Sequence, residues 1–454
     1  MKIAFIHYNL DYCGVISVIR GNITGLKKAF KNIKITLIGN LKKKFLLLKG
    51  INYINIAELG ITKKKLAKFK KNNALQYINE GIKIYEKLKK ILKNFDCTII
   101  ENPIIGLHPP ATYAFYRLSK DKSIKKLFYR IHDFPYQRQE CLENLKKFDG
   151  KKGKPYWHNI LFPSGENPTY MVLNSHDSSK LKKEGIKRVF LMPDLINEDL
   201  LQKNKKLSEN LKREIIKNKN LEEDARFLLY PVRTVPRKNI EEAIFLTLLL
   251  RRYMKKNFYL IVTLTEKKLE SGNYAHKIIN FVKKHKLPVI IGLNLPEKRL
   301  TKKNKIISYS IGDAYNICDA VITTSTLEGF GLLFIESWYF GKSLIGRDIP
   351  KITIDFKKNN INLQHLYKKL LIGKKDFKDI NNLKEKLRLS LKLKDEKFKN
   401  RVIENNKKTL MKIKRVFYNN KIIKKNKEQV IKNYSQIKIA HRLMNAIKTC
   451  NTKL

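Results

Sequence analysis

The chain has 454 residues, with 96 Lys or Arg against 40 Asp or Glu, which gives a formal net charge of +56. A hydrophobic fraction of 43% is enough for a buried core and excludes a disordered basic tail protein. Five scattered cysteines, without a Cys-x-x-Cys pair, exclude a disulfide scaffold. No stretch approaches the roughly 18–20 apolar residues of a membrane span, so we expect a cytoplasmic protein.

The positive charge favours anionic partners but does not identify one. A basic stripe would indicate nucleic acid, yet the lysines run through every segment and occur with abundant Asn and Ile. This pattern indicates that Lys occupies solvent-facing positions throughout the chain, and it argues against a nucleic-acid partner. A basic nucleic-acid-binding protein is kept as an alternative function.

The first 200 residues alternate short apolar runs with helical patterns, which predicts a parallel, doubly wound α/β domain. The expected strands cover residues 2–8, 34–39, 53–56, 96–103, 126–134, 169–176 and 189–196. The expected helices cover 15–30, 63–93, 112–120 and 178–185.

Residues 201–224 are polar and charged and are expected to form a linker region. The alternation then restarts over residues 225–356, which predicts a second Rossmann-like domain. Its expected strands cover 226–232, 258–265, 288–293, 320–325 and 343–348, and its helices 238–256, 274–286, 311–319 and 330–340. Residues 357–454 are expected to be a Lys-rich helical extension.

A Gly-rich loop follows the expected strand at 320–325 and opens a helix. Gly329 and Gly331 allow the backbone to approach a ligand closely, and Glu336 lies about one and a half turns into the expected helix. A carboxylate there has the acceptors to bind two hydroxyls of a ribose. The alternative is a Gly-rich turn with a capping Glu.

Three further residues follow strands, where ligands of open α/β sheets bind. Arg233 and Lys238 stand between the first strand and the first helix of the second domain, where two cations suit a diphosphate. His132 follows a strand of the first domain and would face the cleft between the domains. The alternatives are ordinary surface charge for the two cations and a core histidine beside Asp133.

Other motifs are weak or missing. Gly14 follows the first strand, but no Gly-x-Gly-x-x-Gly is present, so dinucleotide binding is poorly supported. No Asp-x-Asp occurs, which argues against a metal-held nucleotide sugar, and no zinc or serine hydrolase motif occurs.

The sequence resembles the retaining GT-B glycosyltransferases of family 4, also called group 1. The most specific match is Glu-x7-Glu at Glu328 and Glu336 with its EGFG, followed by GKSLIGRDIP at 341–350. Weaker matches across nearly the whole chain are YPVRTVPRKN at 230–239, IHD at 131–133, FLMPDLI at 190–196 and NYSQIKIAHRL at 433–443.

The resemblance implies two Rossmann-like domains that face a cleft, and transfer of a hexose from a nucleotide diphosphate sugar to an acceptor hydroxyl. It implies retention of anomeric configuration and no metal or cofactor. It also implies that the last helix of the extension 357–454 returns to the first domain. The acceptor would be a glycan, a lipid-linked or a small molecule, and a role in cell envelope polysaccharide biosynthesis is expected. The basic C-terminal helices would allow peripheral contact with an anionic membrane.

The resemblance also assigns roles to residues. Glu336 would bind the ribose, Arg233 and Lys238 the leaving diphosphate, and His132 the transferred sugar from the first domain. Glu328 would orient the sugar. The loop amides of Gly329, Phe330 and Gly331 would also orient the sugar, and Gly14 would contact the donor. Cys13–Gly14 stands where the family usually has paired glycines. A catalytically inactive GT-B-like scaffold is the remaining alternative.

Overall fold

The computed structural model divides into two compact units, each with its own sheet. Unit 1 comprises residues 1–197 and 434–454, and unit 2 comprises residues 198–433. The structure describes residues 1–10, 14–41, 48, 50–148, 156–165, 167–200, 204–264, 273–302, 305–373 and 382–450.

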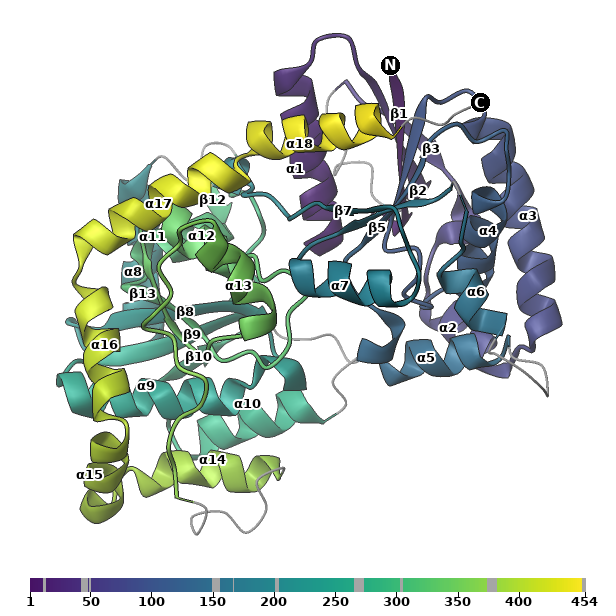
Figure 1. The fold of residues 1–454 in the computed structure, drawn as a ribbon. Helices are drawn as coiled ribbons and strands as arrows, with labels where there is room; N and C mark the ends of the chain where they lie inside the picture. The colour runs from purple at the N-terminus through teal and green to yellow at the C-terminus, as the bar shows by residue number, and fades with distance from the viewer. Residues whose placement is uncertain are drawn as a thin grey trace. The chain divides into compact units, whose positions relative to one another are not determined.

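Unit 1 is built on a seven-stranded sheet in which all neighbouring strands are parallel (Figure 1). Its order is β3 (Asn52–Asn55), β2 (Lys34–Asn40), β1 (Lys2–Asn9), β4 (Cys97–Glu101), β5 (Leu127–Ile131), β6 (Thr169–Val172) and β7 (Val189–Leu191). Its helices are α1 (Gly14–Ala29), α2 (Lys63–Lys71), α3 (Ala74–Leu92), α4 (Pro109–Ser119), α5 (Gln139–Lys146), α6 (Tyr156–Leu161), α7 (Ser175–Lys183) and α18 (Gln436–Thr449).

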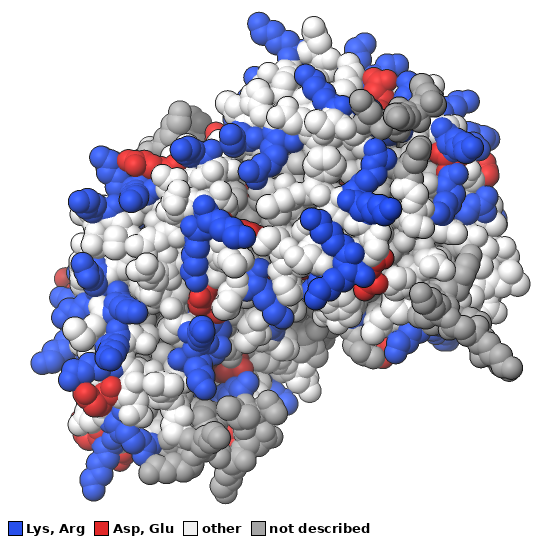
Figure 2. Space-filling view, in the orientation of Figure 1, with Lys and Arg blue, Asp and Glu red and all other residues white. Residues whose placement is uncertain are grey.

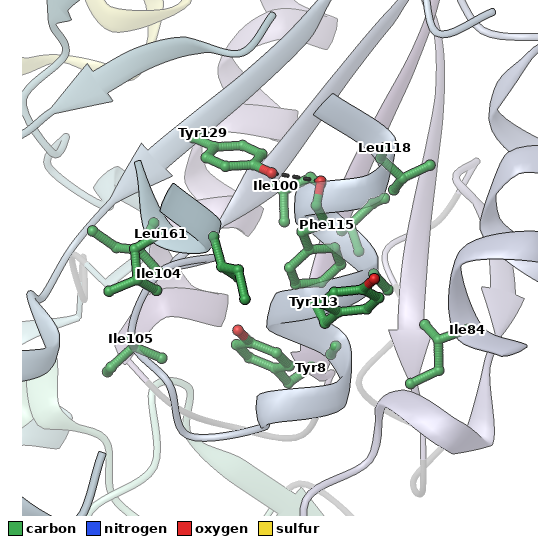
Figure 3. Packing of buried hydrophobic residues seen from close by; sticks show 14 of the residues in the cluster. Tyr8, Ile84, Ile100, Ile104, Ile105, Tyr113, Phe115, Leu118, Tyr129 and Leu161 are labelled. Carbon is green, nitrogen blue, oxygen red and sulfur yellow. Dashed lines mark hydrogen bonds between the residues drawn. The ribbon is translucent and has the colours of Figure 1, made fainter. Parts of the chain in front are cut away.

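Helices cover both faces of this sheet, as the alternation of side chains along β1 requires. Ala4, Ile6 and Tyr8 belong to one hydrophobic cluster, and Ile3 and Phe5 belong to another. The first cluster includes side chains of α3 and α4, and Figure 3 shows its close packing, with the hydroxyl of Tyr129 bonded to the carbonyl of Phe115. The second cluster includes side chains of α1 and α18.

Helix α18 is the C-terminal element of unit 1 and packs directly against α1. A Cβ added at Gly25 of α1 would lie 2.4 Å from the carbonyl oxygen of Gln436, so only glycine fits at this crossing. Lys28 Nζ also donates to Gln436 Oε1 over 2.7 Å. The chain therefore ends in the same unit in which it begins.

Unit 2 is built on a five-stranded sheet whose neighbouring strands are also parallel. Its order is β10 (Val289–Ile291), β9 (Phe258–Leu264), β8 (Arg226–Arg233), β13 (Ala320–Thr323) and β14 (Ser343–Gly346), beside an antiparallel pair of β11 (Leu300–Lys302) and β12 (Lys305–Ser308). Its helices are α8 (Lys205–Lys219), α9 (Ile240–Met254), α10 (Tyr274–Lys284), α11 (Ile311–Ile317), α12 (Leu333–Tyr339), α13 (Pro350–Lys358), α14 (Leu383–Lys392), α15 (Glu396–Asn405), α16 (Lys407–Phe417) and α17 (Asn420–Tyr434).

The predicted fold class, two doubly wound α/β units with C-terminal helices, is confirmed, and the differences are local. The single helix expected at 63–93 is two helices, because Asn73 caps α3 with a capping box to Gln76. The expected linker 201–224 includes α8, which packs on α11 within unit 2; residues 201–203 lie outside the described residues. Helix α12 begins at Leu333 rather than 330.

The surface charge is spread rather than gathered on the face that Figure 2 shows. Lys and Arg side chains are scattered across it, with Asp and Glu among them. This pattern fits lysines that fill solvent-facing positions. Within the described residues, no helix is long and apolar enough to cross a membrane.

Candidate active site

The sheet of unit 2 has one point where its strand order reverses, between β8 and β13. From β8 the chain runs outward through β9 and β10 and then returns to the other side of β8 with β13 and β14. Ligands of open parallel sheets bind beyond the strand ends at such a point. The loops that leave it are residues 234–239, after β8, and residues 324–332, after β13.

The two loops meet through one buried ion pair. Lys238 Nζ lies 2.5 Å from Glu328 Oε1, and Arg237 Nη1 lies 3.7 Å from Glu328 Oε2. The backbone N–H of Thr326 donates to the carbonyl of Arg237 over 2.9 Å. Arg233, at the end of β8, is close enough for its charge to act on Lys238.

The electrostatics of this pair leave an excess of positive charge. Burial lowers the pKa of Lys238 against the opposing charge of Glu328, and the charges of Arg237 and Arg233 lower it further. Burial acts to raise the pKa of Glu328, but the charges of Lys238 and Arg237 outweigh it, so this pKa is lowered. Among the described residues, these two loops and the end of β8 therefore bring Lys238, Arg237 and Arg233 together, an arrangement of cations suited to a dianion.

A buried tyrosine fixes the turn that carries Lys238. The Tyr230 hydroxyl donates to the carbonyl of Lys238 over 2.8 Å and lies 2.7 Å from Ser325 Oγ. Thr324 Oγ1 donates to the carbonyl of Asn239 over 2.8 Å, and Asn239 adopts a left-handed φ of 50°. Side chains of the strand ends thus hold the short helical turn in place before α9 starts.

The glycine loop 329–331 is shaped by packing against α12 and α13. Gly331 has a φ of 83°, and a Cβ there would lie 2.7 Å from the ring of Phe334, so glycine is required on both counts. This positive φ also explains why the helix starts only after the loop. The ring of Phe330 is buried and packs edge-on against Phe356.

Glu336 lies in the first turn of α12 and accepts a hydrogen bond from the Tyr315 hydroxyl over 2.8 Å. The ring of Tyr315 is stacked on Phe340 at 4.3 Å, which holds the hydroxyl in place. Burial raises the pKa of Glu336 to about 7, and the charge of Glu297 adds to this effect against the hydrogen bond from Tyr315. The carboxyl group of Glu336 therefore titrates near neutral pH.

Two predicted site residues lie in unit 1. His132 follows β5, is buried, and bonds through Nε2 to Glu101 Oε2 over 2.6 Å; Asp133 instead pairs with Arg138 at 3.1 Å. Gly14 is the first residue of α1, and a Cβ there would meet nothing within 4 Å. Residues 11–13 of its loop, including Cys13, lie outside the described residues.

The structure thus brings together Lys238, Glu328 and Arg233, and it places Glu336 on the helix that follows the glycine loop. The sequence reasoning missed Arg237, although it is adjacent to Lys238 in an obvious basic pair. It also missed Tyr230 and Tyr315 and the carboxylate of Glu101, because ordinary strand and helix positions gave no signal. Among the described residues, no group of three or more His, Cys, Asp or Glu is placed to hold a metal ion.

Comparison with known proteins points to glycosyltransferases. Residues 212–409 match the family model of glycosyl transferases group 1. The fold aligns with a sucrose-phosphate synthase from Thermosynechococcus elongatus at a TM-score of 0.60 and 14% identity, over 99% of this chain and 98% of that chain. Residues 212–409, which lie in unit 2, are therefore similar to glycosyl transferases of group 1, the fold is GT-B, and the protein is a nucleotide-sugar-dependent glycosyltransferase.

Two curated relatives come from Petrotoga mobilis. The chain is 28% identical over 403 residues to a mannosylglucosyl-3-phosphoglycerate synthase, covering 84% of this chain and 70% of the relative. It is 24% identical over 374 residues to a mannosylglucosylglycerate synthase, covering 74% of this chain and 80% of that relative.

Proposed function

We propose that this glycosyltransferase moves a hexose from a nucleotide diphosphate sugar to a hydroxyl of a small glycerate-containing glycoside. The transfer proceeds with retention of anomeric configuration, without a metal ion and without a cofactor. The observation that carries the proposal is the group of cations at the carboxyl ends of β8 and β13, where Lys238 and Arg237 pair with Glu328 and Arg233 lies near Lys238.

The chemistry needs this charge when the donor breaks down. The bond between the sugar C1 and the diphosphate oxygen breaks while the acceptor oxygen forms its bond to C1. Negative charge develops on the leaving diphosphate, which takes up the proton that the acceptor hydroxyl loses. Fixed cations in a poorly solvated site stabilise that charge without reorganisation, which is usually the largest catalytic contribution. Lys238 and Arg233 take the role that a divalent metal fills in other transferases.

The remaining site residues bind and orient the donor. Glu336 accepts the ribose hydroxyls, and the amides of residues 329–331 face the sugar or its phosphates. Glu328 holds Lys238 in place and orients the sugar. His132 contacts the transferred sugar. A small acidic acceptor is supported by the names of both Petrotoga relatives and by the +56 charge of the chain.

The test is a matrix of donors and acceptors. UDP, GDP and ADP sugars are first ranked by thermal shift, where a ligand at 100 times its dissociation constant stabilises by about 2.7 kcal/mol. The best donor is then incubated with glucosylglycerate and with glucosyl-3-phosphoglycerate, and the products are identified by mass spectrometry and by the anomeric coupling constant. We expect a disaccharide product of retained configuration, and no product with any pair would refute the proposal.

One further arm of this assay tests metal independence. EDTA is expected to leave the rate unchanged, and a loss restored by added Mg²⁺ would contradict metal independence.

A lipid-linked acceptor is the second candidate, favoured by the Lys-rich helices α14 to α17. Preferential sedimentation with anionic over neutral vesicles would support it, since each Lys near such a surface contributes about 1 kcal/mol.

A further inference from the structure

Five ionisable side chains gather in unit 1 at the carboxyl ends of its strands. His7 lies near the end of β1, Glu101 ends β4, Arg130 lies in β5, His132 follows β5, and Asp194 follows β7. All five are buried, with exposed fractions of 9% or less. The strand order of this sheet reverses between β1 and β4, so the cluster occupies the position where an open sheet binds ligands.

The contacts within the cluster centre on the imidazole of His132. Its Nε2 lies 2.6 Å from Glu101 Oε2, and its Nδ1 lies 3.9 Å from Asp194 Oδ1. Arg130 bonds to Asp194 Oδ1 over 2.9 Å and lies 3.9 Å from Glu101 Oε1. Because Glu101 and Arg130 are paired in the β4–β5 register, the sheet itself sets their spacing.

The backbone beside His132 is held as well. Asn102 adopts a left-handed φ of 58°, and its Oδ1 accepts the N–H groups of His132 and Asp133 over 3.3 and 3.1 Å. Two sets of contacts thus connect the loop after β5 to the end of β4. The backbone N–H groups of residues 132 and 133 bond to Asn102, and the ring of His132 bonds to Glu101. Both ties fix the direction of the imidazole.

We propose that Glu101 is a positioning residue for the transfer reaction: it holds the His132 ring through Nε2 and leaves Nδ1 as the nitrogen that serves the sugar. This inference rests on the proposed function, in which His132 contacts the transferred sugar. A buried carboxylate on one ring nitrogen fixes the orientation and the proton of the other, as in other His–carboxylate pairs.

The charges around the ring favour its protonated form. Burial acts to lower the pKa of His132, but the hydrogen bond to Glu101 and the charges of Asp194 and Glu101 outweigh it and raise this pKa, against the charge of Arg130. Burial lowers the pKa of His7 to about 4, so His7 is neutral at pH 7. The pKa of His132 is therefore raised above the ordinary value for histidine, and kcat should fall as pH rises through it.

The experiment compares Glu101→Gln with the wild type in the complete enzyme. With donor and acceptor saturating, we expect kcat to fall about 10- to 100-fold, as when carboxylate partners of functional histidines are removed. The alkaline limb of the kcat profile should move to lower pH, and the pKa of His132, read from ¹⁵N-histidine NMR, should fall. Donor affinity should stay within about twofold of wild type.

A matched control is available on the surface of unit 1. Glu184 Oε2 lies 2.8 Å from His158 Nε2 in an exposed pair, so Glu184→Gln removes the same kind of partner away from the cluster. It should leave kcat and its pH profile unchanged. If Glu101→Gln fails to fold, the wild type still decides the matter: ¹⁵N-histidine NMR should show a proton on Nε2 of His132, bonded to Glu101, and an Nε2 that carries no proton would overturn the proposal.

The outcomes separate the inference from the function on which it rests. Wild-type kcat and an unshifted His132 titration in Glu101→Gln, with activity lost in His132→Ala, would overturn the positioning role and leave the proposed function standing. Wild-type kcat in His132→Ala would overturn both the positioning role and the assignment of His132 to the sugar.

Discussion

Replacing Lys238 with Met is expected to lower kcat about 10²- to 10³-fold, the range seen when one electrostatic contact to a developing anion is removed. Lys238 is buried, and the chain fixes it through Tyr230 and Glu328, so under the proposed function its charge would meet the leaving diphosphate without rearrangement. Met fills a similar volume but removes the nearest cation from Glu328, which keeps the more distant Arg237 and the hydroxyl of Ser325. The transfer assay with saturating donor measures the effect.

Stability must be separated from catalysis in this variant, because an unpaired buried carboxylate is costly. The double variant Lys238→Met/Glu328→Gln removes both charges, so it should regain melting temperature but not activity. Lys386→Met is the matched control, since Lys386 Nζ pairs with Glu241 at 3.6 Å elsewhere in unit 2 and should keep its rate within about twofold. Near-wild-type kcat in folded Lys238→Met would remove this lysine from the mechanism.

Donor affinity is expected to rise about tenfold between pH 6 and pH 8. Glu336 has a pKa of about 7, so it is mostly neutral at the lower pH and mostly a carboxylate at the higher one. Two ribose hydroxyls donate best to the carboxylate, and apparent affinity scales with the fraction of protein in the competent form. Calorimetric titration with an intact nucleotide sugar measures the donor affinity at each pH. The intact sugar nucleotide is used because its esterified diphosphate lacks the ionisation that a terminal phosphate has at about pH 6, so the charge of the ligand stays constant.

The control is Glu336→Gln, which cannot ionise. Its affinity should be independent of pH over this range and about 10- to 100-fold below that of the wild type at pH 8, which corresponds to a lost charge-assisted hydrogen bond. Tyr315→Phe keeps the carboxylate but removes its fixed donor, so the pH midpoint should move upward. Affinity that falls with rising pH in the wild type would contradict the assignment of Glu336 to the ribose.

The sequence predicted the fold well where local pattern and position agree. The β-α alternation predicted every strand of both parallel sheets, and residues just after strands led to Lys238, Glu328 and His132. Glycine spacing was equally informative, since Gly331 has the positive φ that the loop requires. These features depend on residues that are close together in the sequence, so the sequence alone reveals them.

Features that depend on distant neighbours could not be predicted. Glu101 reads as a residue of a buried strand, and only the β4–β5 register reveals that it faces Arg130 and lies within reach of His132. The pairing of Lys238 with Glu328 joins loops 90 residues apart. The raised pKa of Glu336 likewise comes from burial that no sequence window shows.

The most direct test of the central claim is a crystal structure of the protein with a bound nucleotide diphosphate sugar. The account predicts that the ribose hydroxyls lie within hydrogen-bond distance of Glu336 and that the diphosphate lies on Lys238 and Arg233 beyond β8. A nucleotide bound elsewhere on the chain, or one whose diphosphate is held by a metal ion without Lys238, would contradict it.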